Sequence, residues 1–125
     1  MRYSIEKDGQ VIVVHLTADM WGKIEDYQLK DEVAAQLEQG GKHFVFEFSK
    51  SNAINSTGIG IVVSSLTAIQ RAGGRLRLCG LNPRVNATFE ITGIANILSI
   101  FDSYESAVRV PWPEGSTKGE SKEDE

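Results

Sequence analysis

Short apolar stretches alternate with amphipathic stretches along most of the chain. Four segments rich in β-branched and aromatic residues predict strands, at residues 11–16, 44–48, 75–81 and 97–101. Residues 3–5 alternate between apolar and polar side chains, which predicts an additional edge strand. Asp8-Gly9 predicts the hairpin turn between this edge strand and the first buried one.

The amphipathic stretches have the spacing of helices. Leu29, Val33 and Leu37 recur every four residues within a predicted helix at residues 26–39, and Gly40-Gly41 ends it. A second helix is predicted at residues 58–72. Its apolar face consists of Ile59, Val62, Val63, Leu66 and Ile69.

Two shorter helices are predicted toward the end of the chain. Asn82 is a good N-cap and Pro83 suits the first turn, so a third helix is expected to start there and to end at Gly93. Residues 104–108 predict a last short helix. Strands that alternate with helices of this length indicate βαβ units with right-handed crossovers. We therefore predict an α/β fold with a small mixed, mostly parallel sheet and helices mainly on one side.

A chain of 125 residues has room for one domain with one core. We assign residues 1–110 to this domain and residues 111–125 to an acidic tail. The tail has no core-forming pattern, so we expect it to be disordered beyond Trp112.

The net charge of −4 belongs mostly to the tail. Residues 114–125 carry five acids and two lysines, a net of −3, which leaves −1 for residues 1–113. A nearly neutral body argues against nucleic-acid binding.

No apolar run approaches the roughly 20 residues of a transmembrane helix, and the first residues do not resemble a secretory signal. With a single cysteine, Cys79, no internal disulfide can form, and we expect a cytoplasmic protein without membrane insertion.

The sequence offers no constellation of catalytic or metal-binding residues. His15 and His43 lie far apart, with no cysteine or acid at ligand spacing, so we expect no metal site and no cofactor. Cys79 falls in an alternating strand, where a core position is the usual one. We see no Ser-His-Asp or paired-carboxylate pattern, and we expect that the protein is not an enzyme.

The most informative segment is Asn55-Ser56-Thr57-Gly58, between a strand and the second long helix. Ligands and partners of α/β sheets gather where strands end and helices begin. Two hydroxyl groups there lie near the positive end of a helix dipole, where a phosphate is favoured. The alternative is that Ser56 or Thr57 only caps the helix, and the two roles are compatible.

The segment around Ser56 also carries a resemblance to a known family. Residues 54–63, Ile-Asn-Ser-Thr-Gly-Ile-Gly-Ile-Val-Val, resemble the signature loop of anti-sigma-factor antagonists, the STAS family. The likeness covers roughly residues 5–110. It continues through residues 73–79, 82–85, 89–94 and 103–108.

This resemblance implies a partner-switching regulator. Such a protein binds an anti-sigma factor, often a serine kinase, and so releases a sigma factor. The kinase phosphorylates the first hydroxyl of the signature, which is Ser56 here (Thr57 being the alternative), and a serine phosphatase restores the complex. Asn55 stands where the family has an acid, and Asp19 matches one acid of the preceding loop. These departures favour an alternative, a non-switching adaptor or scaffold in a regulatory or transport assembly. A small enzyme is a third, less favoured class.

We expect the partner to dock around Ser56 and along the helix that follows it. Ile61 and Ser65 fall off the apolar stripe and carry no charge, so they are predicted to be exposed and to bind the partner. Met20 and Trp21 are predicted apolar anchors from the preceding loop. The full predicted contact set is Asp19, Met20, Trp21, Asn55, Ser56, Thr57, Gly58, Ile61 and Ser65. The sequence does not fix an oligomeric state.

Overall fold

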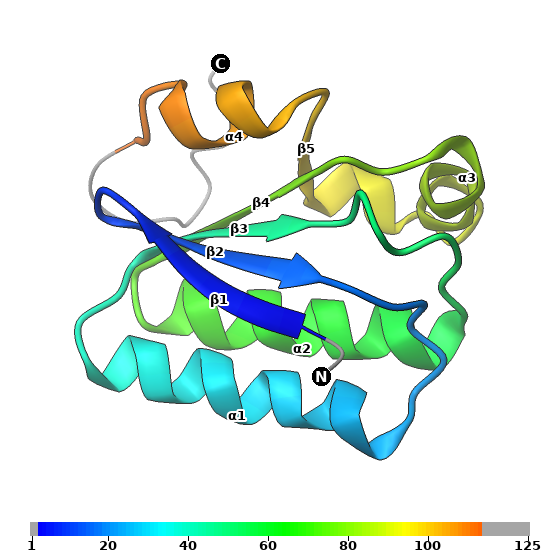
Figure 1. Cartoon of the computed structure of the whole chain (residues 1–125), viewed down its shortest axis with the longest axis horizontal. Helices are drawn as coiled ribbons and strands as arrows, with labels where there is room; N and C mark the ends of the chain where they lie inside the picture. Colours follow the sequence, from blue (N-terminus) through cyan, green and yellow to red (C-terminus); the bar gives the residue numbers. More distant parts are fainter. Residues whose placement is uncertain (1–2, 114–125) are drawn as a thin grey trace.

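The computed structural model describes residues 3–113 (Figure 1). Its strands are β1 (Tyr3–Asp8), β2 (Val11–Leu16), β3 (His43–Glu47), β4 (Arg75–Cys79) and β5 (Ser99–Phe101). Its helices are α1 (Ile24–Glu38), α2 (Ser56–Arg71), α3 (Pro83–Ile91), the 3₁₀ helix η1 (Ile94–Ile97) and α4 (Tyr104–Arg109).

The five strands form one sheet in the order β1-β2-β3-β4-β5. The edge strand β1 pairs antiparallel with β2, and the other three pairings are parallel. The parallel strands are joined through α1, α2 and α3, as right-handed crossovers require. The predicted mixed, mostly parallel α/β sheet is confirmed.

The helices divide unequally between the two faces of the sheet (Figure 1). α1 and α2 lie side by side over one face, above a core that includes Val14, Phe44, Phe46 and Leu78. Within residues 3–113, α4 is the only helix on the opposite face. There Ala107 and Val108 pack against Val11, Val13, Val45 and Cys79. The expectation of helices mainly on one side is therefore confirmed.

Several element boundaries differ from the prediction. α1 and α2 each begin two residues earlier, at Ile24 and Ser56. The predicted strand at residues 97–101 is shortened to Ser99–Phe101. Gly93 has a left-handed φ of 78° and caps the 3₁₀ helix η1, whose last residue, Ile97, is the residue at which the strand was predicted to begin. The apolar run there is a tight turn with an exposed Ile97, which the strand pattern did not distinguish.

The C-terminal end of the described chain is held down by a buried arginine. Arg77 donates hydrogen bonds to the carbonyls of Ala107 (2.9 Å), Val110 (2.8 Å) and Pro111 (2.8 Å). Its guanidinium also lies 3.7 Å from the centre of the Trp112 ring. Burial, followed by the charge of Arg75, lowers the pKa of Arg77 to about 10, so it stays charged at neutral pH.

These contacts fix Pro111 and Trp112 against the sheet, which accords with the expectation that disorder begins only beyond Trp112. The division of the chain at residue 110 stays a prediction. The sequence did not show that Arg77 would hold them. The remainder of the predicted tail, from residue 114 onward, lies outside the described residues. Across residues 3–113, no helix is both long and apolar enough to cross a bilayer.

Candidate functional site

Two loops meet at the carboxyl ends of β2 and β3. Residues 17–23 follow β2 and residues 48–55 follow β3. Met20 and Ile54 form an isolated parallel bridge beyond the strands. The amide of Met20 donates to the carbonyl of Ala53 (3.0 Å), and the amide of Asn55 donates to the carbonyl of Met20 (3.1 Å). The bridge thus fixes the loop before α1 to the loop before α2.

Polar side chains extend this network to a third loop. A carboxylate oxygen of Asp19 accepts from the amide of Asn52 at 2.7 Å. The side chain of Asn82, which caps α3, donates to the carbonyl of Asn52 at 3.3 Å. Asp19 is half-buried, so its first role in this structure is to join the loops. Its predicted contact with a partner stays a prediction.

Asn55 is the N-cap of α2. Its side-chain oxygen accepts from the amide of Gly58 at 2.9 Å, and its side-chain nitrogen donates to the carbonyl of Trp21 at 3.1 Å. The alternative that Ser56 or Thr57 caps the helix is therefore wrong. An aspartate at this position would supply the same acceptor oxygen to Gly58, so the departure from the family pattern leaves the cap intact.

The loops approach each other so closely that glycine is required at two points. A Cβ on Gly58 would lie 2.6 Å from the carbonyl oxygen of Met20. A Cβ on Gly22 would lie 2.4 Å from Cγ2 of Thr57, and Gly22 has a left-handed φ of 86°. Trp21 and Gly22 are thus positioned beside the first turn of α2.

Ser56 is the first residue of α2, and its side chain is exposed. Within residues 3–113 its hydroxyl makes no hydrogen bond, because Asn55 already fills the cap. The first turn of α2 contains no acidic side chain, and of its first amides that of Gly58 is occupied by Asn55. The hydroxyl is therefore accessible to an enzyme, at a helix end that favours negative charge.

Two predicted docking residues are not on the surface. Ile61 is 2% exposed and Ser65 is 1% exposed. The hydroxyl of Ser65 donates to the carbonyl of Ile61 at 3.0 Å. α1 packs beside α2, so α2 is covered by more than the sheet alone. The predicted exposure of Ile61 and Ser65 was wrong, and a charged side chain introduced at position 65 is expected to destabilise the fold.

Met20 also differs from its predicted role. Its side chain is 2% exposed and belongs to the main core, so it cannot serve as an apolar anchor. Trp21, in contrast, is 46% exposed, as an anchor requires. The chain turns between them at the bridge, which sends one side chain inward and the next outward.

The exposed strip of α2 begins at Ser56 and passes through Gly60 and Thr67. It carries no charged side chain before Arg71. Beside it, the start of α1 exposes Ile24 (77%) and Tyr27 (47%). Sequence reasoning missed these two, although both fall off the face defined by Leu29 and Val33.

Two titratable groups elsewhere among residues 3–113 have shifted pKa values that their surroundings explain. His15 bridges Glu6 (2.7 Å) and Glu47 (3.1 Å) on the α4 side of the sheet. Burial lowers the pKa of His15, but the bonds to Glu6 and Glu47 raise it above its ordinary value overall. Burial raises the pKa of Cys79 to about 12, so its thiol is inert at neutral pH. Among residues 3–113, no three His, Cys, Asp or Glu side chains are arranged to hold a metal ion.

Known proteins resemble this chain in sequence and in fold. Residues 2–107 match the STAS domain family. BtrV of Bordetella bronchiseptica, named as a candidate anti-sigma factor antagonist, is 34% identical over 80 residues, which are 64% of this chain and 69% of that protein. The anti-sigma F factor antagonist of Paenibacillus polymyxa is 22% identical, over 86% of this chain and 92% of its own. The Bacillus cell fate determinant SpoIIAA, solved in its phosphorylated form, superposes with a TM-score of 0.67. It is 18% identical, and the match covers 87% of this chain and 99% of that one.

Proposed function

Since the chain belongs to the STAS domain family of anti-sigma factor antagonists, we propose that it binds an anti-sigma factor at the Ser56 end of the sheet. The partner is a serine kinase, and its capture releases a sigma factor. Phosphorylation of Ser56 weakens the complex, and a serine phosphatase restores it. A protein with these partners acts in the cytoplasm, by binding and without a reaction of its own.

The observation that carries this proposal is the state of Ser56. Its hydroxyl is exposed at the start of α2 and has no hydrogen-bond partner among residues 3–113, and the Asn55 cap keeps the helix end intact without it. A modifying enzyme can therefore reach the hydroxyl without unwinding the helix. Thr57 is also exposed, but its side chain adjoins Gly22, which narrows access to it.

The surroundings of Ser56 support a docking role. The strip from Ser56 through Gly60 to Thr67 is uncharged, and Trp21, Ile24 and Tyr27 expose apolar surface beside it. Exposed aromatic side chains next to small uncharged residues are typical of the centre of a protein interface.

A phosphate on Ser56 changes this surface from neutral to strongly negative. It adds about −1.5 to −2 charges at neutral pH. Binding of the partner would then require removal of the water around the phosphate, which costs free energy. A loss of about 1.4 kcal/mol already weakens a complex tenfold, so one modification is enough for a switch. The N-terminal end of a helix favours a negative charge, so the phosphate is expected to leave the domain folded.

The test is a pull-down from the native cell extract with the wild type, Ser56→Ala and Ser56→Asp. Mass spectrometry reads the partners and the phosphorylated residue. We expect the wild type and Ser56→Ala to recover a serine kinase that Ser56→Asp does not. Equal recovery by all three, with no phosphate on Ser56, would contradict the switch and leave the non-switching adaptor.

Gly60→Glu separates docking from the switch. A Cβ at Gly60 would have no neighbour within 4 Å in the described part of the chain, and the residue is exposed one turn after Ser56. Its new charge is therefore expected to abolish recovery of the partner without unfolding the domain. Gln10→Glu adds the same single charge at an exposed position in the turn between β1 and β2, at the other end of the sheet, and is the control that should keep binding.

A further inference from the structure

The strand β1 forms one edge of the sheet and has the features of an edge that can accept another strand. It pairs with β2 over six residues in an unbroken register, and within residues 3–113 no strand pairs with its outer side. Edge strands that resist association are commonly very short, bulged or interrupted by proline, and β1 has none of these features. Its outer row of backbone groups can therefore pair with a further strand.

The hairpin turn determines which backbone groups of β1 face outward. Asp8 and Val11 form the last pair of the hairpin, on either side of a two-residue turn. Such a turn is closed by a hydrogen-bonded pair, and hydrogen-bonded and non-hydrogen-bonded pairs alternate along an antiparallel ladder. Counting back from Asp8, every second residue of β1 bonds β2 in the same way. The backbone N–H and C=O groups of the other residues face away from β2, and these residues are Tyr3, Ile5 and Lys7.

The two faces of β1 restrict how a second copy of the chain can pair with it. Two identical edge strands pair antiparallel about a two-fold axis perpendicular to the sheet, which keeps each face on its own side. The residue on the axis then faces its own copy. With Glu6 on the axis, two like charges would be opposed, whereas with Ile5 on the axis two apolar side chains meet. Ser4 then faces Glu6 of the other copy. Tyr3 faces Lys7 in the same way, so no like charges are opposed.

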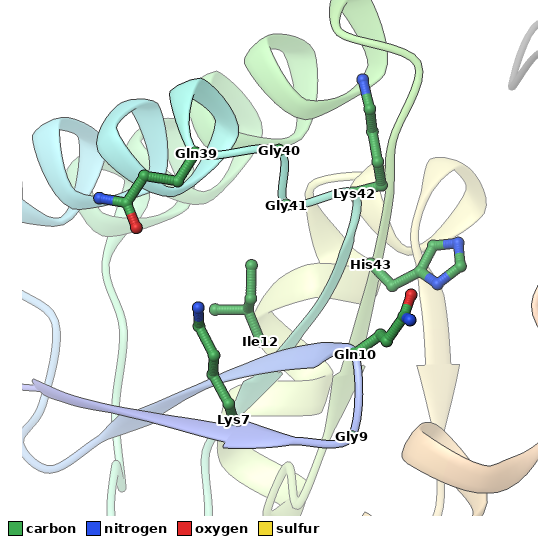
Figure 2. A pocket seen from close by; sticks show the side chains of 9 residues that line it. All are labelled: Lys7, Gly9, Gln10, Ile12, Gln39, Gly40, Gly41, Lys42 and His43. Carbon is green, nitrogen blue, oxygen red and sulfur yellow. The ribbon is translucent and has the colours of Figure 1, made fainter.

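This register also brings opposite charges together. The hydroxyl of Tyr3 donates to the carbonyl of Gln28 on α1 at 3.5 Å. Burial raises the pKa of the Tyr3 phenol, and the carboxylates of Glu32 and Asp31 raise it further, so both acids lie close to this side chain. Lys7 points to the same helix-covered side of the sheet (Figure 2), and within residues 3–113 its ammonium makes no hydrogen bond or ion pair. Placed opposite Tyr3, this ammonium would reach the two carboxylates of the other copy.

We propose that two copies of this chain associate through β1, antiparallel and in register about Ile5, to form one continuous sheet with five strands from each copy. The outward backbone groups of the two strands pair with each other. Lys7 of each copy forms an ion pair with Glu32 or Asp31 of the other, so the contact occurs twice. Exposed ion pairs are individually weak, so the dimer is expected to dissociate on dilution and at high salt.

The first test measures association of the full chain and the surface that it covers. Sedimentation equilibrium should show a monomer at about 20 μM and a growing share of dimer toward about 1 mM. Hydrogen exchange under the same conditions should show protection of the Ile5 and Lys7 amides only at the higher concentration. The amides of Glu6 and Asp8, which bond β2, should change little. A chain that stays monomeric, or a dimer whose added protection lies elsewhere, would overturn the proposal.

An exchange of charges then tests the register. Lys7→Glu should weaken association at least about tenfold, because each dimer loses two attractive contacts and gains two repulsive ones. Adding Glu32→Lys, which restores the net charge of the wild type, should recover most of the association. Lys50→Glu makes the same change in charge as Lys7→Glu at an exposed position in the loop after β3, and it should leave association unchanged.

Equal weakening by Lys7→Glu and Lys50→Glu, or no recovery in the double variant, would contradict pairing about Ile5. Each of these variants changes a side chain that is at least partly exposed, so all are expected to fold. None of these outcomes depends on whether an anti-sigma factor binds.

Discussion

At the scale of single residues, Asn55 determines the geometry of the candidate site. Its side chain caps α2 at Gly58 and holds the carbonyl of Trp21. We predict that Asn55→Ala lowers the free energy of unfolding by about 1–2 kcal/mol, because the cap is lost. Asn55→Asp should cost less, since a carboxylate still accepts from Gly58. Urea unfolding measures both, and an unchanged midpoint for Asn55→Ala would show that the cap does not stabilise the site.

The same residue shows what the sequence could and could not predict. The sequence located the start of α2 to within two residues, because good capping residues follow an apolar strand there. It pointed to Ser56 or Thr57 as the cap and not to Asn55, because all three residue types are good caps and local sequence does not rank them. The choice is made by the backbone of Met20, 35 positions earlier in the chain, which bonds the amide of Asn55. Such a contact has no signal in local sequence.

At the scale of elements, two glycines of α2 are predicted to respond oppositely to the same substitution. Gly60→Ala should stabilise the protein by roughly 0.5–1 kcal/mol, because alanine favours a helix and its Cβ meets nothing. Gly58→Ala should destabilise by about 1–3 kcal/mol, because its Cβ would press on the carbonyl of Met20. Thermal or urea unfolding of the two variants compares them directly. Stabilisation by both would mean that the loop before α1 is not packed against α2 as described.

The elements also show why the docking surface was partly mispredicted. The pattern of α2 revealed the strip that packs on the sheet, since Ile59, Val62 and Ile69 have helical spacing. It did not reveal that Ile61 and Ser65 are buried as well. Two helices that lie side by side on one face of a sheet, as α1 and α2 do, bury part of each other. The sequence pattern of α2 alone carries no signal of its neighbour, so it predicted that Ser65 is polar and exposed.

At the scale of the whole molecule, stability is predicted to depend on pH through His15. Bonds to Glu6 and Glu47 hold the folded pKa of His15 above the ordinary value of 6.5, despite the opposing effect of burial. The stabilisation is therefore fully present below the unfolded pKa and is lost as the pH rises through the folded pKa. The difference in unfolding free energy between the wild type and His15→Gln should be larger at about pH 6 than at about pH 8.5. A difference that stays constant across this range would contradict the account.

The second histidine provides an internal control. Burial, together with the charges of Arg77 and Arg75, lowers the pKa of His43 below its ordinary value. An NMR titration of the two rings should therefore give midpoints on opposite sides of 6.5. If both midpoints lay on the same side, the environment of one ring would differ from the structure.

The overall fold was the most predictable feature, because alternating strands and helices leave few topologies open. The attachment of the C-terminal segment was not predictable. Arg77 occupies an alternating strand position that looks solvent-facing, yet it is buried and bonds three carbonyls from residues 107–111. Only the folded sheet brings this guanidinium to those carbonyls, which lie 30 or more positions later in the chain.

The central claim is that Ser56 switches the binding of an anti-sigma factor, and its most direct test is an affinity measurement. Isothermal titration of the recovered kinase would compare the unmodified protein with protein phosphorylated at Ser56 and verified by mass spectrometry. We predict that the phosphate weakens the complex at least about tenfold, or about 1.4 kcal/mol. Equal affinity of the two forms would contradict the account, because the exposed hydroxyl at the start of α2 would then play no part in partner choice.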